Sequence, residues 1–334
     1  MENYTPIFNI TPEILTLTYE IAGDLERIDI IREKALTPQL RKENRIRSIH
    51  SSLWIEANNL TLEQVAAIVD GKQVDGAEKD ILEAKNAIIA YDELLVCNPY
   101  SEKDLLKQHK LLMKGLIEDA GLYRNSGIGV FDGDVPIHVA PPHHRVAILM
   151  GQLLDWAKDA KLPQVVKSCI FHYEFEFIHP FSDGNGRMGR MWQTLLLYQD
   201  NPVFAWLPID DKIAENQDEY YRALRRSTHH NDSGIFVLFM LSIIKQVTGE
   251  FKDKYQKDAG VNAGVNAGVK LTKIQVKIMS LINSNIFITQ SEITKKLKVN
   301  ESTVYRNIEK LKMLGILVRE GSDKTGRWII KENI

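Results

Sequence analysis

One segment of twelve residues, His179 to Arg190, limits what this chain can fold into more than any other feature. It reads HPFSDGNGRMGR and so combines a histidine, a carboxylate, closely spaced glycines and two arginines. Apolar residues recur at helical spacing over 165–178 before it and over 190–198 after it. The segment is therefore predicted to be a loop that joins two helices and carries reactive side chains.

The glycines of this loop predict a site for an anion. Gly184 and Gly186 flank Asn185, and glycine accepts positive φ without steric cost, so successive backbone N–H groups can converge on one point. The second helix begins there with the positive end of its dipole, which favours phosphate. Arg187 and Arg190 are three residues apart and share a helix face, from which both can reach a polyphosphate.

A carboxylate and an imidazole precede this turn. Asp183 supplies oxygen of the kind that Mg²⁺ prefers when the ion also binds substrate phosphates. Histidine has an ordinary pKa of about 6.5, so His179 can accept a proton from a hydroxyl near neutral pH. Each of these residues has a common structural explanation when it occurs alone. Their combination in one loop indicates a site that handles a polyphosphate, with Phe181 as the apolar anchor of the loop.

The segment resembles the signature of the Fic domain family, H-x-F-x-[D/E]-G-N-G-R-x-x-R, and matches it at every fixed position. Fic proteins characteristically transfer the AMP part of ATP to a hydroxyl of a target protein and release pyrophosphate. The resemblance implies that His179 is the catalytic base and that Asp183 binds Mg²⁺. It places Asn185 and the glycine backbone at the α-phosphate and the two arginines at the outer phosphates. The nucleotide-binding residues in the loop are then Gly184, Asn185, Gly186, Arg187 and Arg190.

Flanking segments extend the resemblance. Residues 105–116, followed by 121–124, are similar to the family's helix and the start of its flap, a hairpin that holds the target segment beside the loop. Residues 126–140 are that candidate flap. Residues 218–224 are similar to the helix near the adenine pocket, where Tyr221 is expected to contact the nucleotide; ordinary core packing is the alternative for this tyrosine. The implied fold is mainly α, a Fic-type helical bundle with a small β-hairpin flap.

A second motif lies upstream. Ser52 to Glu56 is similar to the family's inhibitory helix, [S/T]-x-x-x-E-[G/N], although Ala57 stands where Gly or Asn is usual and Asn58 comes one place later. The resemblance implies that Glu56 pairs with Arg190. An arginine held by a carboxylate cannot also hold the γ-phosphate of ATP, because both are strong charge-assisted acceptors. The chain thus resembles the Fic class that is inhibited by an N-terminal helix.

Length and composition limit the number of domains, the chemistry of the cysteines and the expected location of the protein. The chain has 334 residues, of which 44% are hydrophobic and 26% charged, enough for two or three domains. Cys97 and Cys169 are too few for a disulfide framework or a zinc site. We see no leader and no run of ~20 apolar residues, so we expect a cytoplasmic protein that does not interact with a membrane. The expected parts are an N-terminal helical region with the inhibitory helix (1–100), a Fic catalytic core (101–258), a linker of repeated AGVN (259–269) and a C-terminal domain (270–334). An interrupted helix is the alternative for the AGVN repeat.

The C-terminal domain resembles a winged helix-turn-helix. It holds thirteen basic and six acidic residues, a net charge of +7, whereas the rest of the chain carries −9. Such a module favours nucleic acid through phosphate neutralisation. Protein docking and dimerisation are open alternatives, so a homodimer is possible. The expected elements are helices at 274–282, 290–297 and 301–314 and strands at 316–318 and 327–330, with Ser302, Thr303, Tyr305 and Arg306 at the start of the recognition helix.

The resemblance implies a protein adenylyltransferase that uses ATP and Mg²⁺, modifies a Ser, Thr or Tyr hydroxyl and is restrained by Glu56. Three alternatives stay open. The first is Fic-type transfer of another phosphate-containing group, and the second is removal of AMP with help from Glu56. The third is a DNA-binding regulator that senses nucleotide without turnover. No residue identifies the target protein.

Overall fold

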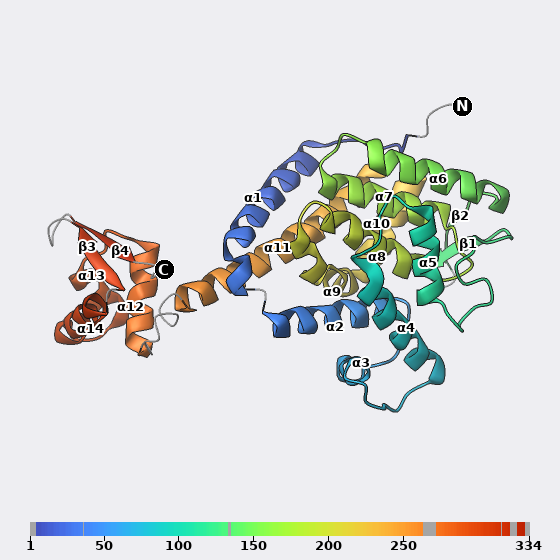
Figure 1. Ribbon diagram of the computed structural model, residues 1–334. Coiled ribbons are helices and arrows are strands. Elements are labelled where there is room, and N and C mark those ends of the chain that lie inside the picture. Colours follow the sequence, from blue (N-terminus) through green and yellow to red (C-terminus); the bar gives the residue numbers. More distant parts are fainter. Residues whose placement is uncertain are drawn as a thin grey trace. The chain divides into compact units, whose positions relative to one another are not determined.

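The computed structural model describes residues 5–35, 37–132, 135–262, 272–314, 316–320 and 326–330. Helices dominate, and the strands form two separate two-stranded antiparallel sheets (Figure 1). The predicted mainly α fold with a small hairpin is confirmed. Contacts divide the chain into two compact units, a larger one that ends at Phe251 and a smaller one that begins at Lys252 and includes Glu33–Ala35.

Helices of the larger unit surround a central pair, α7 and α8, which lie side by side (Figure 1). Nearly every residue of α7 is buried, as expected of a helix that is hydrophobic on all sides. The core beneath the loop contains Phe171, Phe175, Phe181 and Trp192. The helices are α1 (Pro12–Ala35), α2 (Pro38–Ile55), α3 (Leu62–Val69), α4 (Glu78–Leu94), α5 (Glu102–Leu112), α6 (His143–Asp159), α7 (Gln164–Ile178), α8 (Asn185–Tyr198), the 3-10 helix η1 (Pro202–Trp206), α9 (Ile209–Glu215), α10 (Gln217–His230) and α11 (Gly234–Asn262).

The predicted flap is a β-hairpin. Strand β1 (Gly129–Asp132) pairs with β2 (Val135–Val139), with Gly129 opposite Val139 and Asp132 opposite Val135. The register shifts between Val130 and Phe131, as at a β-bulge. Residues 133 and 134 at the tip lie outside the described part of the chain.

The smaller unit has the predicted winged-helix order. It contains α12 (Lys273–Ser284), α13 (Gln290–Leu297), α14 (Glu301–Met313), β3 (Leu317–Glu320) and β4 (Arg327–Ile330). Trp328 closes its core: the indole Nε1 donates to the Ile288 carbonyl at 2.7 Å, and the backbone N–H donates to the Ile286 carbonyl at 2.7 Å. Residues 321–325 of the predicted wing lie outside the described residues.

Helix α11 extends into the segment that was predicted to be a linker. Helix α11 continues through Asn262 and so includes residues 259–262 of the AGVN repeat; residues 263–269 lie outside the described part. The repeat has neither charge nor proline, and adding residues to an existing long helix needs no new nucleation, so one glycine is tolerated. The expected boundary at residue 258 therefore falls inside a helix.

One stretch of α11, Gly234–Tyr255, is long and apolar enough to cross a membrane by length and composition, with mean hydropathy 1.5. Lys245 and Glu250 interrupt this stretch, so it is not a continuous run of ~20 apolar residues. The core helix of a soluble protein passes the same test, and 56% of the apolar window is buried inside the structure. Phe236, Met240 and Leu241 are among its fully buried side chains.

Candidate active site

His179, the predicted base, ends helix α7 in the left-handed conformation, with φ 49° and ψ 64°. This conformation is uncommon for a residue with a side chain and needs support from its surroundings. Arg124 supplies that support: its Nε donates to the His179 carbonyl at 2.8 Å and its backbone N–H to the Pro180 carbonyl at 3.0 Å. The same guanidinium donates to the carbonyls of Ser126 and Pro141, which lie before and after the hairpin. Arg124 therefore ties the predicted flap to the loop that begins with His179.

Of the two glycines that flank Asn185, only Gly184 has the positive φ expected of the turn, because Gly186 already lies in the first turn of α8. Gly184 has φ +81°, and a Cβ there would lie 2.6 Å from Met113 Sδ, so a larger residue would be both strained and crowded. Asn185 closes the loop, because its Oδ1 accepts from the Phe181 N–H and its Nδ2 donates to the Phe181 carbonyl, both at 2.9 Å. The structure thus gives the Asn185 side chain a role in shaping the loop at the N-terminus of α8.

A carboxylate already lies beside this N-terminus. A Cβ on Gly186 would come within 2.3 Å of Glu56 Oε1 and 3.2 Å of Arg190 Nη1. The absent side chain of Gly186 therefore leaves the space in which Glu56 approaches the start of the helix. Because helix N-termini attract anions, this is the place where a phosphate would also be stabilised.

Arg190 is buried and is held by residues of the predicted inhibitory helix. Its side chain is 1% exposed, and its Nη2 lies 2.9 Å from Glu56 Oε1. It also donates from Nη2 to the Ser52 carbonyl at 3.0 Å and from Nε to Ser52 Oγ at 3.3 Å. Burial opposes the charge of this guanidinium, but Glu56 together with Asp210, Tyr220 and Tyr221 outweighs burial and raises the pKa of Arg190. The structure thus brings together all three residues of the predicted inhibitory contact.

Asp183 lies at the exposed edge of the loop, with its side chain 50% exposed. Its Oδ1 accepts from the Gly184 N–H at 2.6 Å and lies 3.5 Å from Arg187 Nη2. Among the described residues, no group of three His, Cys, Asp or Glu side chains could hold a metal by itself. Asp183 fits a Mg²⁺ ion only when phosphates and water complete the coordination, which is the usual way Mg²⁺ is bound.

Tyr221 is half-buried on α10, and burial followed by the Glu56 carboxylate raises its pKa to about 12. The charge of Glu56 thus acts on Tyr221, consistent with a position near the site. Its neighbour Tyr220 belongs to the core: it is 1% exposed, and its hydroxyl lies 3.1 Å from His172 Nε2. For Tyr220, ordinary packing is the sufficient explanation.

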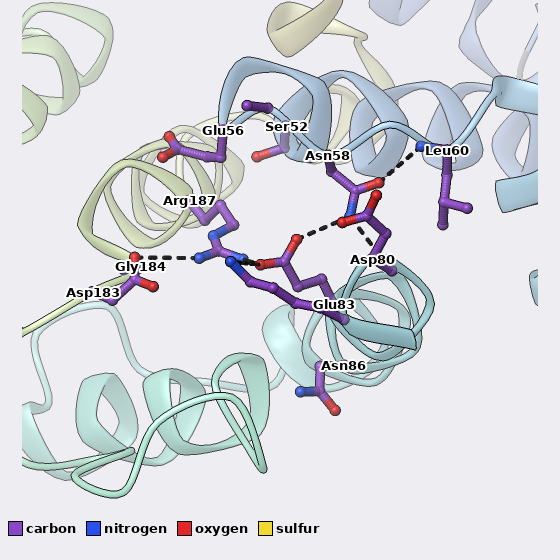
Figure 2. A network of polar contacts seen from close by, with 12 residues as sticks. Ser52, Glu56, Asn58, Leu60, Asp80, Glu83, Asn86, Asp183, Gly184 and Arg187 are labelled. Carbon is purple, nitrogen blue, oxygen red and sulfur yellow. Dashed lines mark hydrogen bonds and ion pairs between the residues drawn. The ribbon is translucent and has the colours of Figure 1, made fainter. Parts of the chain in front are cut away.

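The sequence analysis missed Glu83 on α4. Its Oε1 lies 3.2 Å from Arg187 Nη1, and its Oε2 accepts from Asn58 Nδ2 at 2.9 Å (Figure 2). Asn58 was noted only as a departure from the inhibitory motif. A glutamate that interrupts an apolar helix face, next to Ala84 and Ala87, was the available signal for Glu83.

His109 supports the loop from below. Its Nδ1 accepts from the Gly121 N–H at 2.9 Å, so Nε2 carries the hydrogen and donates to the Asp183 carbonyl at 3.0 Å. Its ring stacks on Phe181, with the ring centres 3.6 Å apart. Burial lowers the pKa of His109 to about 4, so this imidazole is neutral in the folded protein at neutral pH.

This shift predicts acid sensitivity. Because the ordinary pKa of His109 is 6.5, the unfolded chain binds a proton between pH 6.5 and about 4 that the folded protein does not. We expect His109 to lower the free energy of unfolding by about 2 kcal/mol when the pH falls from 7 to 5. Urea unfolding of His109→Gln should show that much less pH dependence than wild type; equal dependence would contradict the prediction. Comparing the two proteins is essential, because Glu176, whose pKa burial raises to about 8, has the opposite effect.

Comparisons with known proteins agree with this site. The Fic/DOC family matches residues 99–197, and an HTH domain matches residues 275–321. The protein adenylyltransferase Fic of Nematostella vectensis is 29% identical over 254 residues, which cover 69% of this chain and 55% of that protein. The protein adenylyltransferase Fic of Aedes aegypti is 33% identical over 170 residues, which cover 47% of this chain and 32% of that protein. The chain therefore spans about half the length, or less, of these relatives.

Solved structures extend the likeness to the whole chain. Fic-1 from C. elegans has a TM-score of 0.55 at 20% identity, covering 73% of this chain and 74% of that one, which shows a shared fold. A Fic family protein from Desulfovibrio desulfuricans G20 has a TM-score of 0.72 and covers 99% of both chains. With 38% identity over that length, this likeness shows that the chain belongs to the Fic family and carries a C-terminal helix-turn-helix domain.

Proposed function

We propose that this protein is an adenylyltransferase that moves AMP from ATP to a Ser, Thr or Tyr hydroxyl of a target protein. The observation that carries the proposal is that Gly186, at the start of α8, leaves space for the Glu56 carboxylate beside the guanidinium of Arg190, because a place that holds one anion also suits a phosphate. This site lies in the loop that begins with His179. Relatives named protein adenylyltransferase support AMP as the transferred group.

In the proposed reaction the outer phosphates of ATP bind to Arg187 and Arg190, and the α-phosphate lies at the N-terminus of α8. His179 accepts the proton of the target hydroxyl, whose oxygen then forms a bond to the α-phosphorus. The bond between that phosphorus and the oxygen bridging to the β-phosphate breaks, and pyrophosphate leaves. When bound by Asp183 and the phosphates, Mg²⁺ would neutralise part of the charge on the leaving group. Most of the catalysis therefore comes from positioning and electrostatics.

Glu56 is the proposed inhibitor of this reaction. Its carboxylate occupies one end of Arg190 in a site where both helix dipole and guanidinium favour an anion. The γ-phosphate of ATP would have to displace it. Since the Glu56 side chain is 28% exposed, it can leave without opening a cavity in the core.

The position of a radioactive label in ATP tests the reaction type. Incubation with a cell extract and the Glu56→Gly variant should transfer label from the α-phosphate to protein and none from the γ-phosphate. Transfer of γ-label would instead indicate phosphorylation, and loss of α-label from an already modified protein would indicate AMP removal. Failure of both labels to reach protein would contradict the proposal.

A second proposed function, DNA binding, is favoured by the surface of α14. Ser302, Tyr305 and Arg306 lie on one helix face and are exposed, at the start of the helix that would enter the major groove. The +7 charge of residues 270–334 would supply phosphate contacts.

Salt dependence tests this second function. We expect duplex DNA to bind the full-length protein with an affinity that falls steeply with added salt, and Arg306→Ala to reduce the slope of log K against log salt by about 1. Lys158→Ala, an exposed change on α6, is the control and should leave the slope unchanged. Absence of binding at low salt would leave protein docking or homodimer formation as the role of this domain.

We also propose a cytoplasmic location. Cys97 and Cys169 are both buried and free, as is usual in a compartment that keeps thiols reduced.

A further inference from the structure

Arg187, the first arginine of the signature, is held by a buried carboxylate (Figure 2). Arg187 Nη1 lies 3.2 Å from Glu83 Oε1, and the two side chains are only 5% and 7% exposed. Water is therefore largely excluded from this pair. Removing one partner of such a pair leaves an uncompensated buried charge, which is costly, whereas an exposed pair contributes little.

The second oxygen of Glu83 is fixed as well. Asn58 Nδ2 donates to Glu83 Oε2 at 2.9 Å, and Asn58 Oδ1 accepts from the Leu60 N–H at 3.1 Å (Figure 2). Asn58 is 3% exposed and is placed by the end of α2, where Ala57 adopts φ 63° and the Asn58 N–H donates to the Leu53 carbonyl. Glu83 is thus held on both oxygens by residues of two different elements.

Arg187 nevertheless keeps unused donors. Its Nε and Nη1 are buried and donate no hydrogen bond to any described residue; Nη1 has only the ion pair with Glu83. Arg190 Nη1 is likewise buried and donates no hydrogen bond to a described residue. Buried donors without acceptors are unfavourable, and the oxygens of a polyphosphate are acceptors that can satisfy them.

From these contacts we propose that Glu83 is a positioning residue: it orients Arg187 for the outer phosphates of ATP and is itself fixed by Asn58. The inference rests on the proposed function, in which Arg187 binds those phosphates. It gives the two carboxylates opposite roles. Glu56 is partly exposed and competes with ATP for Arg190, whereas Glu83 is buried, stays in place and prepares Arg187 for ATP.

Nucleotide binding distinguishes positioning from packing, because AMP lacks the outer phosphates that Arg187 would bind. Calorimetric titration of the full-length Glu56→Gly protein with ATP and with AMP, both with Mg²⁺, gives the reference affinities. Adding Glu83→Ala should weaken ATP binding about tenfold and leave AMP binding unchanged. Glu83→Gln keeps the volume and an acceptor oxygen but loses the charge, so it should restore part of the loss.

Asn86→Ala is the matched control. Asn86 lies one turn along the same helix and is 4% exposed. Its Nδ2 donates to the Lys114 carbonyl at 2.8 Å, and among the described residues it forms no hydrogen bond with an arginine. Its loss should leave the ratio of ATP to AMP affinity unchanged. Asn58→Ala should lower that ratio by less than Glu83→Ala, because the pair with Arg187 remains.

Three results would overturn the inference. Equal loss of ATP and AMP binding in both Glu83 variants would mean that Glu83 only packs, and unchanged binding of both would mean that Arg187 needs no support. Tighter ATP binding would make Glu83 a second inhibitory carboxylate. Failure of the proposed function gives a different pattern: no α-label reaches protein, whatever the titrations show.

Discussion

Replacing Glu56 with glycine should raise the rate of AMP incorporation into protein by about tenfold or more at saturating ATP and Mg²⁺. A hydrogen bond to a charged group contributes about 1.5–3 kcal/mol, and the bond between Glu56 and Arg190 is of this kind, at 2.9 Å. The change frees Arg190 to hold the γ-phosphate, which places the α-phosphate for attack. Because Glu56 lies at the end of α2 and is partly exposed, the fold should tolerate glycine.

Glu56→Gln provides the control for charge. It keeps the size of the side chain but removes its negative charge, so its rate should lie between those of wild type and Glu56→Gly. If the Glu56→Gly protein is no faster than wild type, residues 52–56 have no inhibitory role and only form the end of a helix.

Replacing His179 should remove nearly all transfer while ATP still binds. A base contributes about 10²–10⁴-fold to the rate, and neither alanine nor asparagine can take its place near neutral pH. His179→Asn is the better test than His179→Ala, because asparagine tolerates the left-handed conformation found there, φ 49°. Rates of AMP incorporation should be measured in the Glu56→Gly background, where we expect the fastest transfer.

His143→Ala is the matched control for this experiment. His143 is exposed at the start of α6, and its ring packs edge-on against that of His144. The His143→Ala variant should transfer AMP at the same rate as the Glu56→Gly protein. Transfer by His179→Asn close to that rate would remove His179 from the role of base.

Much of the fold could be predicted because its signals are local. Threonine caps followed three residues later by Gln or Glu mark the starts of α3, α12 and α13, and each forms a capping box in the structure. The winged-helix order was predicted from helical spacing and from turn residues between short apolar runs. The start of the linker was misplaced because a weak repeat can extend a helix that is already formed.

The candidate site was predictable where one segment carries it. The contacts added by the structure join residues far apart in the sequence: Arg124 reaches the His179 carbonyl, and Glu83 reaches Arg187. A buried arginine bonded to carbonyls looks like any other arginine in the sequence. Such partners follow from packing of helices, which local patterns do not specify.

Competition for Arg190 is the central claim, and a four-protein comparison tests it most directly. AMP incorporation from α-labelled ATP should be measured for wild type, Glu56→Gly, Arg190→Ala and the double variant. We predict that Glu56→Gly is fastest and that both proteins lacking Arg190 are inactive, because freeing the site cannot replace a missing phosphate ligand. A double variant as active as Glu56→Gly would contradict the account, since inhibition by Glu56 would then not act through Arg190.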